Sequence, residues 1–152
     1  RQRQMCIRDR TGGAQQALDL TLAYIAERRQ FKRTIASFQA IKHRCADMML
    51  HVECARSAAY YAACVAQERL AADGDANVAK ELELAAATAK IHASEVFFLC
   101  AAESIQLHGG VGFTWEYDPH LYFKRARASE QLLGNPALHR ERIAGHLLGD
   151  SA

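Results

Sequence analysis

The stretch VAKELELAAATAKIHASEVFFLCAAESIQLHGGVG, residues 78–112, decides the fold class. Four apolar side chains recur in it at intervals of seven residues: Leu84, Ile91, Phe98 and Ile105. This spacing is typical of a helix that packs along one seam against other helices. The many alanines have high helix propensity, and the glycines that follow permit a helix stop. We therefore expect one long helix over residues 78–107.

Helices separated by turns continue on both sides of this stretch, and no segment alternates as a β-strand would. The other expected helices cover residues 14–29, 38–71, 119–133 and 136–147. The turn at residues 73–75 separates the two long ones, and Asp118-Pro119 and Asn135-Pro136 have the N-cap and first-turn pattern of helix starts. Long helices with short connections predict an all-α fold, an antiparallel four-helix-type bundle with a short extra C-terminal helix.

Composition narrows the possible functions. The chain has 152 residues, half of them hydrophobic, and a formal net charge of +2. This near-neutral balance gives no reason to expect nucleic acid or a membrane as a partner. We find no unbroken apolar run of the ~20 residues that a membrane helix needs. The five cysteines lack the spacing of a metal site, so no metal is expected. No secretory signal is visible, which makes the cytoplasm the default location.

The first ten residues, RQRQMCIRDR, differ from everything that follows. They are strongly charged and show no helical period, whereas the next segment is rich in alanine. We interpret residues 1–10 as a non-native leader and place them outside the fold. The domain is then expected to span residues 11–152.

Three segments carry distinctive motifs, at residues 24–41, 106–113 and 116–119. Together they resemble the C-terminal domain of acyl-CoA dehydrogenases. YIAERRQF, residues 24–31, followed by SFQAI, residues 37–41, resembles the family pattern Y-x-x-x-R-x-x-F-G and then x-Q-x-I. QLHGGVGF, residues 106–113, resembles Q-x-x-G-G-x-G-[FY]. EYDP, residues 116–119, leads into a basic helix, as the family's E-[YF]-P and R-D-A segment does. The resemblance covers essentially everything from residue 11 onward.

This resemblance implies one domain of a longer subunit that uses FAD to introduce an α,β double bond into an acyl-CoA thioester. It implies a dimer or tetramer, homomeric or heteromeric, with FAD at a subunit interface and an electron-transfer flavoprotein as redox partner. On its own the chain is expected to be inactive. The residues that the resemblance assigns to the FAD of a neighbouring subunit are Arg28, Phe31, Phe38, Gln39, Gln106, Gly109 and Gly110.

The chemistry of these residues suits a dinucleotide. Arg28 has paired donors for a phosphate group. Phe38 and Gln39 begin a helix, where unpaired backbone N–H groups favour an anion. Gly109 and Gly110 allow close approach of the backbone. Each feature also has a plain alternative: Arg28 as a solvated helix charge, and the glycines as a simple helix stop.

The usual catalytic base is missing. In many family members it is the Glu of a Y-E-G-T motif, and Leu133 occupies that position here. Leucine accepts no proton, so we assign no catalytic residue. Arg125 and Lys32 also depart from the family motifs. Either the base lies upstream of this domain, or the chain belongs to a non-catalytic partner subunit of a heteromeric enzyme. A cofactor-free helical interaction module is the third possibility.

Overall fold

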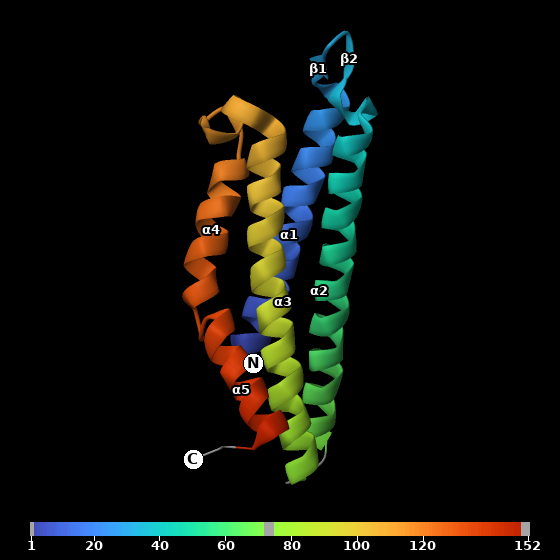
Figure 1. The fold of residues 1–152 in the computed structure, drawn as a ribbon. Helices are drawn as coiled ribbons and strands as arrows, with labels where there is room; N and C mark the ends of the chain where they lie inside the picture. The colour runs from blue at the N-terminus through green and yellow to red at the C-terminus, as the bar shows by residue number, and fades with distance from the viewer. Residues whose placement is uncertain (1, 72–74, 150–152) are drawn as a thin grey trace.

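The computed structural model describes residues 2–71 and 75–149. It forms a bundle of long helices and confirms the all-α prediction (Figure 1). The helices are α1 (Gln2–Glu27), α2 (Gln39–Ala71), α3 (Ala76–His108), α4 (Pro119–Gln131) and α5 (Pro136–Leu148). Consecutive long helices run antiparallel, and α4 and α5 follow one another along the flank of α3. The short fifth helix is also present as predicted.

Helix α3 is central because it packs against α1, α2, α4 and α5. Two of the seam residues, Ile91 and Ile105, are buried, but so are most of the alanines and small polar residues between the seam positions. A helix that is buried on most of its circumference needs small residues wherever a neighbouring backbone comes close. The main core cluster includes Leu18, Ile25, Met48, Val52, Phe97, Cys100 and Ala126.

One contact between α1 and α3 depends on a glycine. A Cβ at Gly13 would lie 2.6 Å from Cζ of the Phe97 ring, so no other residue fits there without displacing the ring. Two helix turns further on, a buried polar pair replaces this apolar contact. Thr21 donates to Oγ of Ser104 at 2.8 Å, which satisfies both hydroxyls inside the core.

The first ten residues are placed differently from the sequence interpretation. Helix α1 begins at Gln2 rather than at residue 14. Ile7 is 2% exposed, and the buried Arg10 donates to the carbonyls of Ser129 and Leu132. Placing this segment outside the fold is therefore wrong. The sequence shows no helical period here because two polar residues, Arg10 and Thr11, lie on the buried face. The non-native origin of residues 1–10 stays a prediction.

The expected loop after the first helix contains a small β-hairpin. Helix α1 ends at Glu27, and β1 (Arg29–Gln30) pairs antiparallel with β2 (Arg33–Thr34). A 3₁₀ turn, η1 (Ile35–Ser37), leads into α2. The prediction that the chain has no strands is wrong at this place, since strands of two residues are too short to show an alternating pattern.

The starts of the later helices agree with the sequence more closely than their ends. Asn135 caps α5 by accepting the N–H of Leu138 at 2.9 Å, and Pro119 lies in the first turn of α4. Helix α4 ends at Gln131, before the expected residue 133, because Leu133 has a left-handed conformation with φ of 63°. The predicted turn at residues 73–75 lies mostly outside the described residues.

Helix α3 together with the turn η2 (Gly109–Phe113) is long and apolar enough to cross a membrane, with a mean hydropathy of 1.3 in its most apolar window. The criterion of an unbroken apolar run missed this segment. However, 67% of that window is buried inside the bundle. Such burial is typical of the core helix of a bundle.

Candidate functional site

The residues that resemble flavin contacts come together at one end of the bundle. The C-terminal ends of α1 and α3, the β-hairpin and the N-terminal end of α2 all lie there (Figure 1). Tyr24 joins the two halves of this end. Its ring stacks on His108 with centroids 4.1 Å apart, and its hydroxyl donates to the His108 carbonyl at 3.2 Å. Tyr24 lies one turn before Arg28, and His108 directly precedes Gly109, so this contact fixes one motif relative to the other.

The hairpin holds Phe31 and Lys32 at its tip in left-handed conformations, with φ of 52° and 65°. Two-residue hairpins of this kind favour Asn-Gly, because side chains with a branched or bulky Cβ strain the positive φ. Phe31 is also 84% exposed, an unusual position for an aromatic ring. Strain and exposure together are typical of a functional segment.

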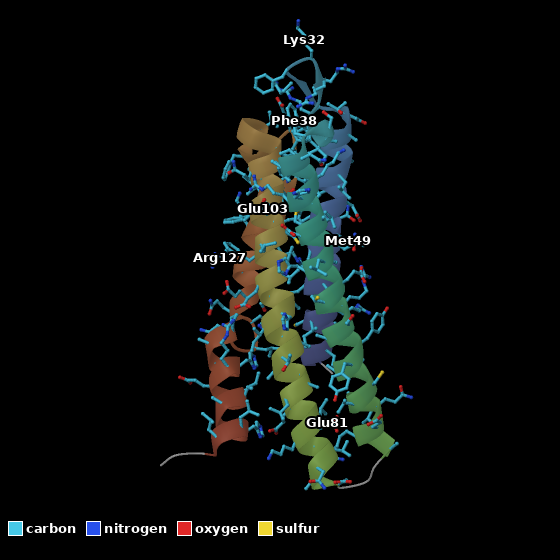
Figure 2. All side chains as sticks on the ribbon, turned by 45° about the vertical axis from the view of Figure 1, so that its right-hand side comes forward. Lys32, Phe38, Met49, Glu81, Glu103 and Arg127 are labelled. Carbon is cyan, nitrogen blue, oxygen red and sulfur yellow. The ribbon has the colours of Figure 1, made fainter. Side chains whose placement is uncertain are left out.

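The base of the hairpin is held by aromatic contacts. The rings of Phe31 and Phe38 pack edge to face, with their centroids 6.1 Å apart. Cζ of the Arg33 guanidinium lies 3.8 Å from the centroid of the Phe38 ring. Figure 2 shows Lys32 at the tip of the hairpin and Phe38 at its base, near the start of α2. These contacts orient the hairpin above the end of the bundle.

Replacing Lys32 with glycine is expected to raise the free energy of unfolding by about 1 kcal/mol, because glycine adopts positive φ without a steric penalty. Urea denaturation monitored by circular dichroism measures the change. Lys42→Gly is the matched control, since it places the same substitution inside α2 and should cost about 1 kcal/mol. Equal effects of the two variants would contradict the strained hairpin.

The remaining predicted residues are accessible at the same end. Arg28 and Gln39 are exposed, and so is Gln106. The Arg28 backbone is fixed, since its N–H donates to the Tyr24 carbonyl and its own carbonyl accepts from Ile35, both at 2.9 Å. The Arg28 guanidinium therefore extends from a rigid point of the chain toward solvent.

The glycine turn separates into open and packed positions. Gly109 ends α3 with φ of 67°, and a Cβ at Gly109 or Gly110 would meet nothing within 4 Å. A Cβ at Gly112 would lie 2.9 Å from the Ile105 carbonyl oxygen. The two glycines assigned to the flavin thus border open space, while Gly112 is the one that packing requires. Sequence reasoning did not separate these roles, because all three belong to one motif.

Sequence reasoning also missed an aromatic cluster beneath the turn. Tyr117 contacts both Tyr24 and His108 edge to face, at 5.3 and 5.6 Å. Nδ1 of His108 donates to the Ser104 carbonyl at 2.7 Å, and burial lowers the pKa of this imidazole. The ring packs against Tyr24 and Tyr117, so its role is structural support of the site.

The position of the usual base holds no ionisable group. Leu133 lies in the turn between α4 and α5, and the carboxylate of Glu130, one turn earlier, pairs with Arg127 at 3.1 Å. Among the described residues, no group of three His, Cys, Asp or Glu side chains is arranged to hold a metal ion. The absence of a catalytic residue and of a metal stays a prediction.

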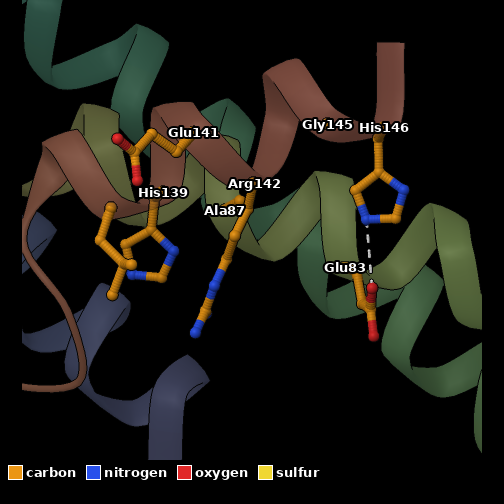
Figure 3. Close-up of a pocket in the computed structure, with 8 residues that line it drawn as sticks. Glu83, Ala87, His139, Glu141, Arg142, Gly145 and His146 are labelled. Atoms are coloured by element: carbon orange, nitrogen blue, oxygen red, sulfur yellow. Dashed lines mark hydrogen bonds and ion pairs between the residues drawn. The ribbon is translucent and has the colours of Figure 1, made fainter. Parts of the chain in front are cut away.

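A separate groove of about 580 Å³ lies between α3 and α5 (Figure 3). Its lining carries both charges, including Arg142 and Glu83, and Nε2 of His146 lies 3.2 Å from the Glu83 carboxylate. His139 also lines this groove, and its side chain is fully buried. None of the predicted flavin residues lines this groove.

Comparison with known proteins places this fold in a family. Residues 1–148 match the model of the family described as acyl-CoA dehydrogenase, C-terminal domain. The chain is 44% identical over 128 residues to acyl-CoA dehydrogenase IpdE2 of Mycobacterium tuberculosis. This alignment covers 84% of the present chain and 36% of the relative. It is 36% identical over 137 residues to subunit CarC of the caffeyl-CoA reductase-Etf complex of Acetobacterium woodii, covering 90% of this chain and 34% of CarC.

Among solved structures, the ChsE4-ChsE5 complex from Mycobacterium tuberculosis contains a chain that superimposes with a TM-score of 0.83 and 30% identity. This match covers 99% of the present chain and 38% of the other. The chain thus spans little more than a third of the length of these relatives. It belongs to the acyl-CoA dehydrogenase family and corresponds to the C-terminal domain of these oxidoreductases.

Proposed function

We propose that this domain contributes one wall of an FAD site at a subunit interface, in an enzyme that dehydrogenates an acyl-CoA thioester. The observation that carries the proposal is the Tyr24–His108 contact, which brings the arginine motif and the glycine turn to one end of the bundle. The residues there fit the cofactor, since an exposed cation, an exposed ring and an open glycine backbone suit a charged aromatic dinucleotide.

Each side chain then has a distinct task. Arg28 places paired donors toward the pyrophosphate, which is stronger than a single charge contact. The exposed Phe31 ring packs on an apolar face of the cofactor. Gln106 donates to polar atoms of the cofactor, and Gly109 and Gly110 let it approach the backbone. FAD, when bound, supplies the redox chemistry that accepts a hydride from the substrate.

The assembly is part of the same proposal. We expect a dimer or tetramer, with an electron-transfer flavoprotein as electron acceptor. One relative is named as a subunit of a complex with Etf, and one solved relative is a complex of two chains, ChsE4 and ChsE5. Exposed apolar residues such as Met49 and Leu50 on α2 (Met49 is labelled in Figure 2) are compatible with a covering partner.

A non-catalytic subunit of a heteromeric enzyme is the second candidate, and Leu133 favours it because this side chain accepts no proton. Anaerobic addition of acyl-CoA to the FAD-containing subunit separates the two possibilities. Bleaching of the flavin indicates a catalytic subunit with its base elsewhere in the chain. A flavin that stays oxidised indicates a subunit that contributes structure and cofactor contacts.

Arg28→Ala is expected to weaken FAD binding by about 10- to 100-fold in the subunit that contains this domain, because hydrogen bonds to a charged group contribute about 1.5–3 kcal/mol. Flavin absorbance after dialysis measures the retained cofactor. Arg142→Ala is the matched control, since this arginine lies in α5, beside the groove in Figure 3. If both variants keep their FAD, the proposed pyrophosphate contact is wrong.

A further inference from the structure

Apolar side chains lie on the outer face of α2 as well as on the face that packs into the bundle. The inner face includes Met48 and Val52, which are 1% and 0% exposed. Four large apolar or aromatic side chains of the same helix are exposed: Met49, Leu50, Tyr60 and Tyr61. A helix with apolar residues on more than one face is usually covered on more than one face. Within the described part of the chain, α2 packs mainly against α1 and α3, so its outer face is open to a partner.

The exposed residues of this outer face form one regular stripe. Steps of four and three residues alternate along it, and all of its members are exposed: His43, Asp47, Leu50, Cys54, Ser57, Tyr61, Cys64 and Glu68. We call this set the α2 stripe. The spacing is that of a coiled-coil seam, here on the side of the helix away from the core. At 1.5 Å per residue the α2 stripe is about 38 Å long.

The aromatic residue of the α2 stripe is held in a fixed orientation. The Tyr61 hydroxyl donates to the carboxylate of Glu81 on α3 at 2.5 Å, while the side chain stays 53% exposed. Glu81 is labelled in Figure 2, on α3 beside the C-terminal half of α2. A ring that is already ordered loses little conformational freedom when a partner packs on it. Tyrosines of this kind are typical anchors of protein interfaces.

The centre of the α2 stripe matches itself when two copies of α2 run antiparallel about a two-fold axis between residues 55 and 56. Leu50 then faces the partner's Tyr61, and Cys54 faces the partner's Ser57. The two small side chains lie at the axis and permit close approach of the helices. The two large apolar side chains pack on either side of them, as knobs pack in a coiled coil.

The charged ends of the α2 stripe favour the same orientation. In a parallel pair, each Asp47 and each Glu68 would face its own copy, and like charges placed opposite one another are unfavourable. In the antiparallel pair, Glu68 faces the partner's His43 instead. The dipoles of the two helices also oppose one another, so the positive N-terminal end of each lies toward the negative C-terminal end of the other. The charges thus fit a second copy of this chain in one orientation.

We infer that the α2 stripe is an interface with a second copy of the chain, in which two α2 helices pack antiparallel about a two-fold axis. Such a contact is isologous, the commonest arrangement in soluble oligomers. The stripe runs along the side of the bundle, whereas the proposed FAD site lies at the hairpin end (Figure 1). The inference therefore goes beyond the proposed function, and neither depends on the other.

The first test is disulfide cross-linking, which reports on the register of the two helices. Ser57→Cys brings a thiol opposite the partner's Cys54, in a chain whose other exposed α2 thiol is removed by Cys64→Ser. Under mild oxidation we expect a covalent dimer that forms at least tenfold faster than in the matched control. The control is Ala63→Cys in the same background, because residue 63 is exposed on α2 but lies outside the stripe. Equal rates in the two variants would show random collision and would overturn the inference.

The second test measures the dimer dissociation constant by sedimentation velocity over a range of concentrations. Leu50→Glu puts a charge beside the partner's Tyr61 and is expected to raise this constant at least tenfold. Leu70→Glu makes the same change at an exposed position of α2 beyond the stripe and should leave the constant unchanged. A wild-type chain that stays monomeric, or a dimer that Leu50→Glu does not weaken, would overturn the inference.

The same cross-link is expected in the FAD-containing subunit. If it forms in the chain alone and not in that subunit, another part of the longer protein covers α2, and the inference is wrong. FAD content should be equal in the wild type and in Leu50→Glu, because the stripe does not reach the hairpin. A subunit that retains no FAD would contradict the proposed function, while the cross-link would still decide whether two α2 helices pair.

Discussion

Truncating Phe97 to alanine is expected to lower the free energy of unfolding by about 3–5 kcal/mol, the usual cost of removing a buried aromatic ring. Phe97 is 2% exposed and belongs to the main core cluster. Its ring fills the space above Gly13, at a contact between α3 and α1. A cavity at this point would separate the two helices that also carry Tyr24 and His108. Since domains are typically stable by only about 5–15 kcal/mol, the loss should be visible in urea denaturation.

The control for this variant is Phe113→Ala, which removes the same ring from a position that is 71% exposed. It should change stability by less than about 0.5 kcal/mol. A similar loss in both variants would mean that the interface between α1 and α3 does not depend on the ring of Phe97. A small loss in Phe97→Ala alone would mean that the neighbouring side chains collapse into the space.

Gly112→Ala is expected to destabilise the chain by about 1–3 kcal/mol, the usual cost of overpacking. The added methyl group would meet the Ile105 carbonyl oxygen and Cβ of His108. Backbone at the end of α3 cannot rotate away as a side chain can, so the turn itself must move. Thermal and urea denaturation measure the loss of stability.

Gly110→Ala provides the matched comparison, because a Cβ at Gly110 meets nothing within 4 Å. Its stability should change by less than about 0.5 kcal/mol. For FAD binding by the FAD-containing subunit, we expect the opposite order of effects. Gly110→Ala should have the larger effect, because it obstructs the proposed contact while the fold stays intact. Destabilisation by Gly110→Ala alone would contradict the separation of open and packed glycines.

The bundle was predictable because its signals are local. The seam in α3, the Asn135 cap and the prolines that start α4 and α5 act within a few residues of the chain. Two parts of the fold were not predictable from local signals. The hairpin at residues 29–34 has strands too short to show a period. The segment around Ile7 carries a buried arginine, Arg10, on the face that would otherwise be apolar. Their conformation depends on contacts with distant helices.

The candidate site shows the same division. The resemblance could name Arg28 and Gly110, because sequence motifs retain residue types at fixed spacing. It could not reveal that Tyr24 stacks on His108, or that Lys90 reaches the carbonyl of Gly134, 44 residues along the chain. A lysine among alanines has the pattern of a solvated helix residue, and only the tertiary fold shows it to be enclosed. The cytoplasmic location and the origin of residues 1–10 stay predictions.

The central place of α3 has a consequence for biosynthesis. Since a ribosome delivers the N-terminal helices first, α1 and α2 emerge while the helix that both of them pack against is still being made. Leu18 and Val52 belong to a core cluster that also includes α3 residues, so this cluster is complete only after α3 has been made. During that interval the nascent pair of helices exposes apolar surface that α3 covers in the folded domain, and such transiently exposed surface favours aggregation.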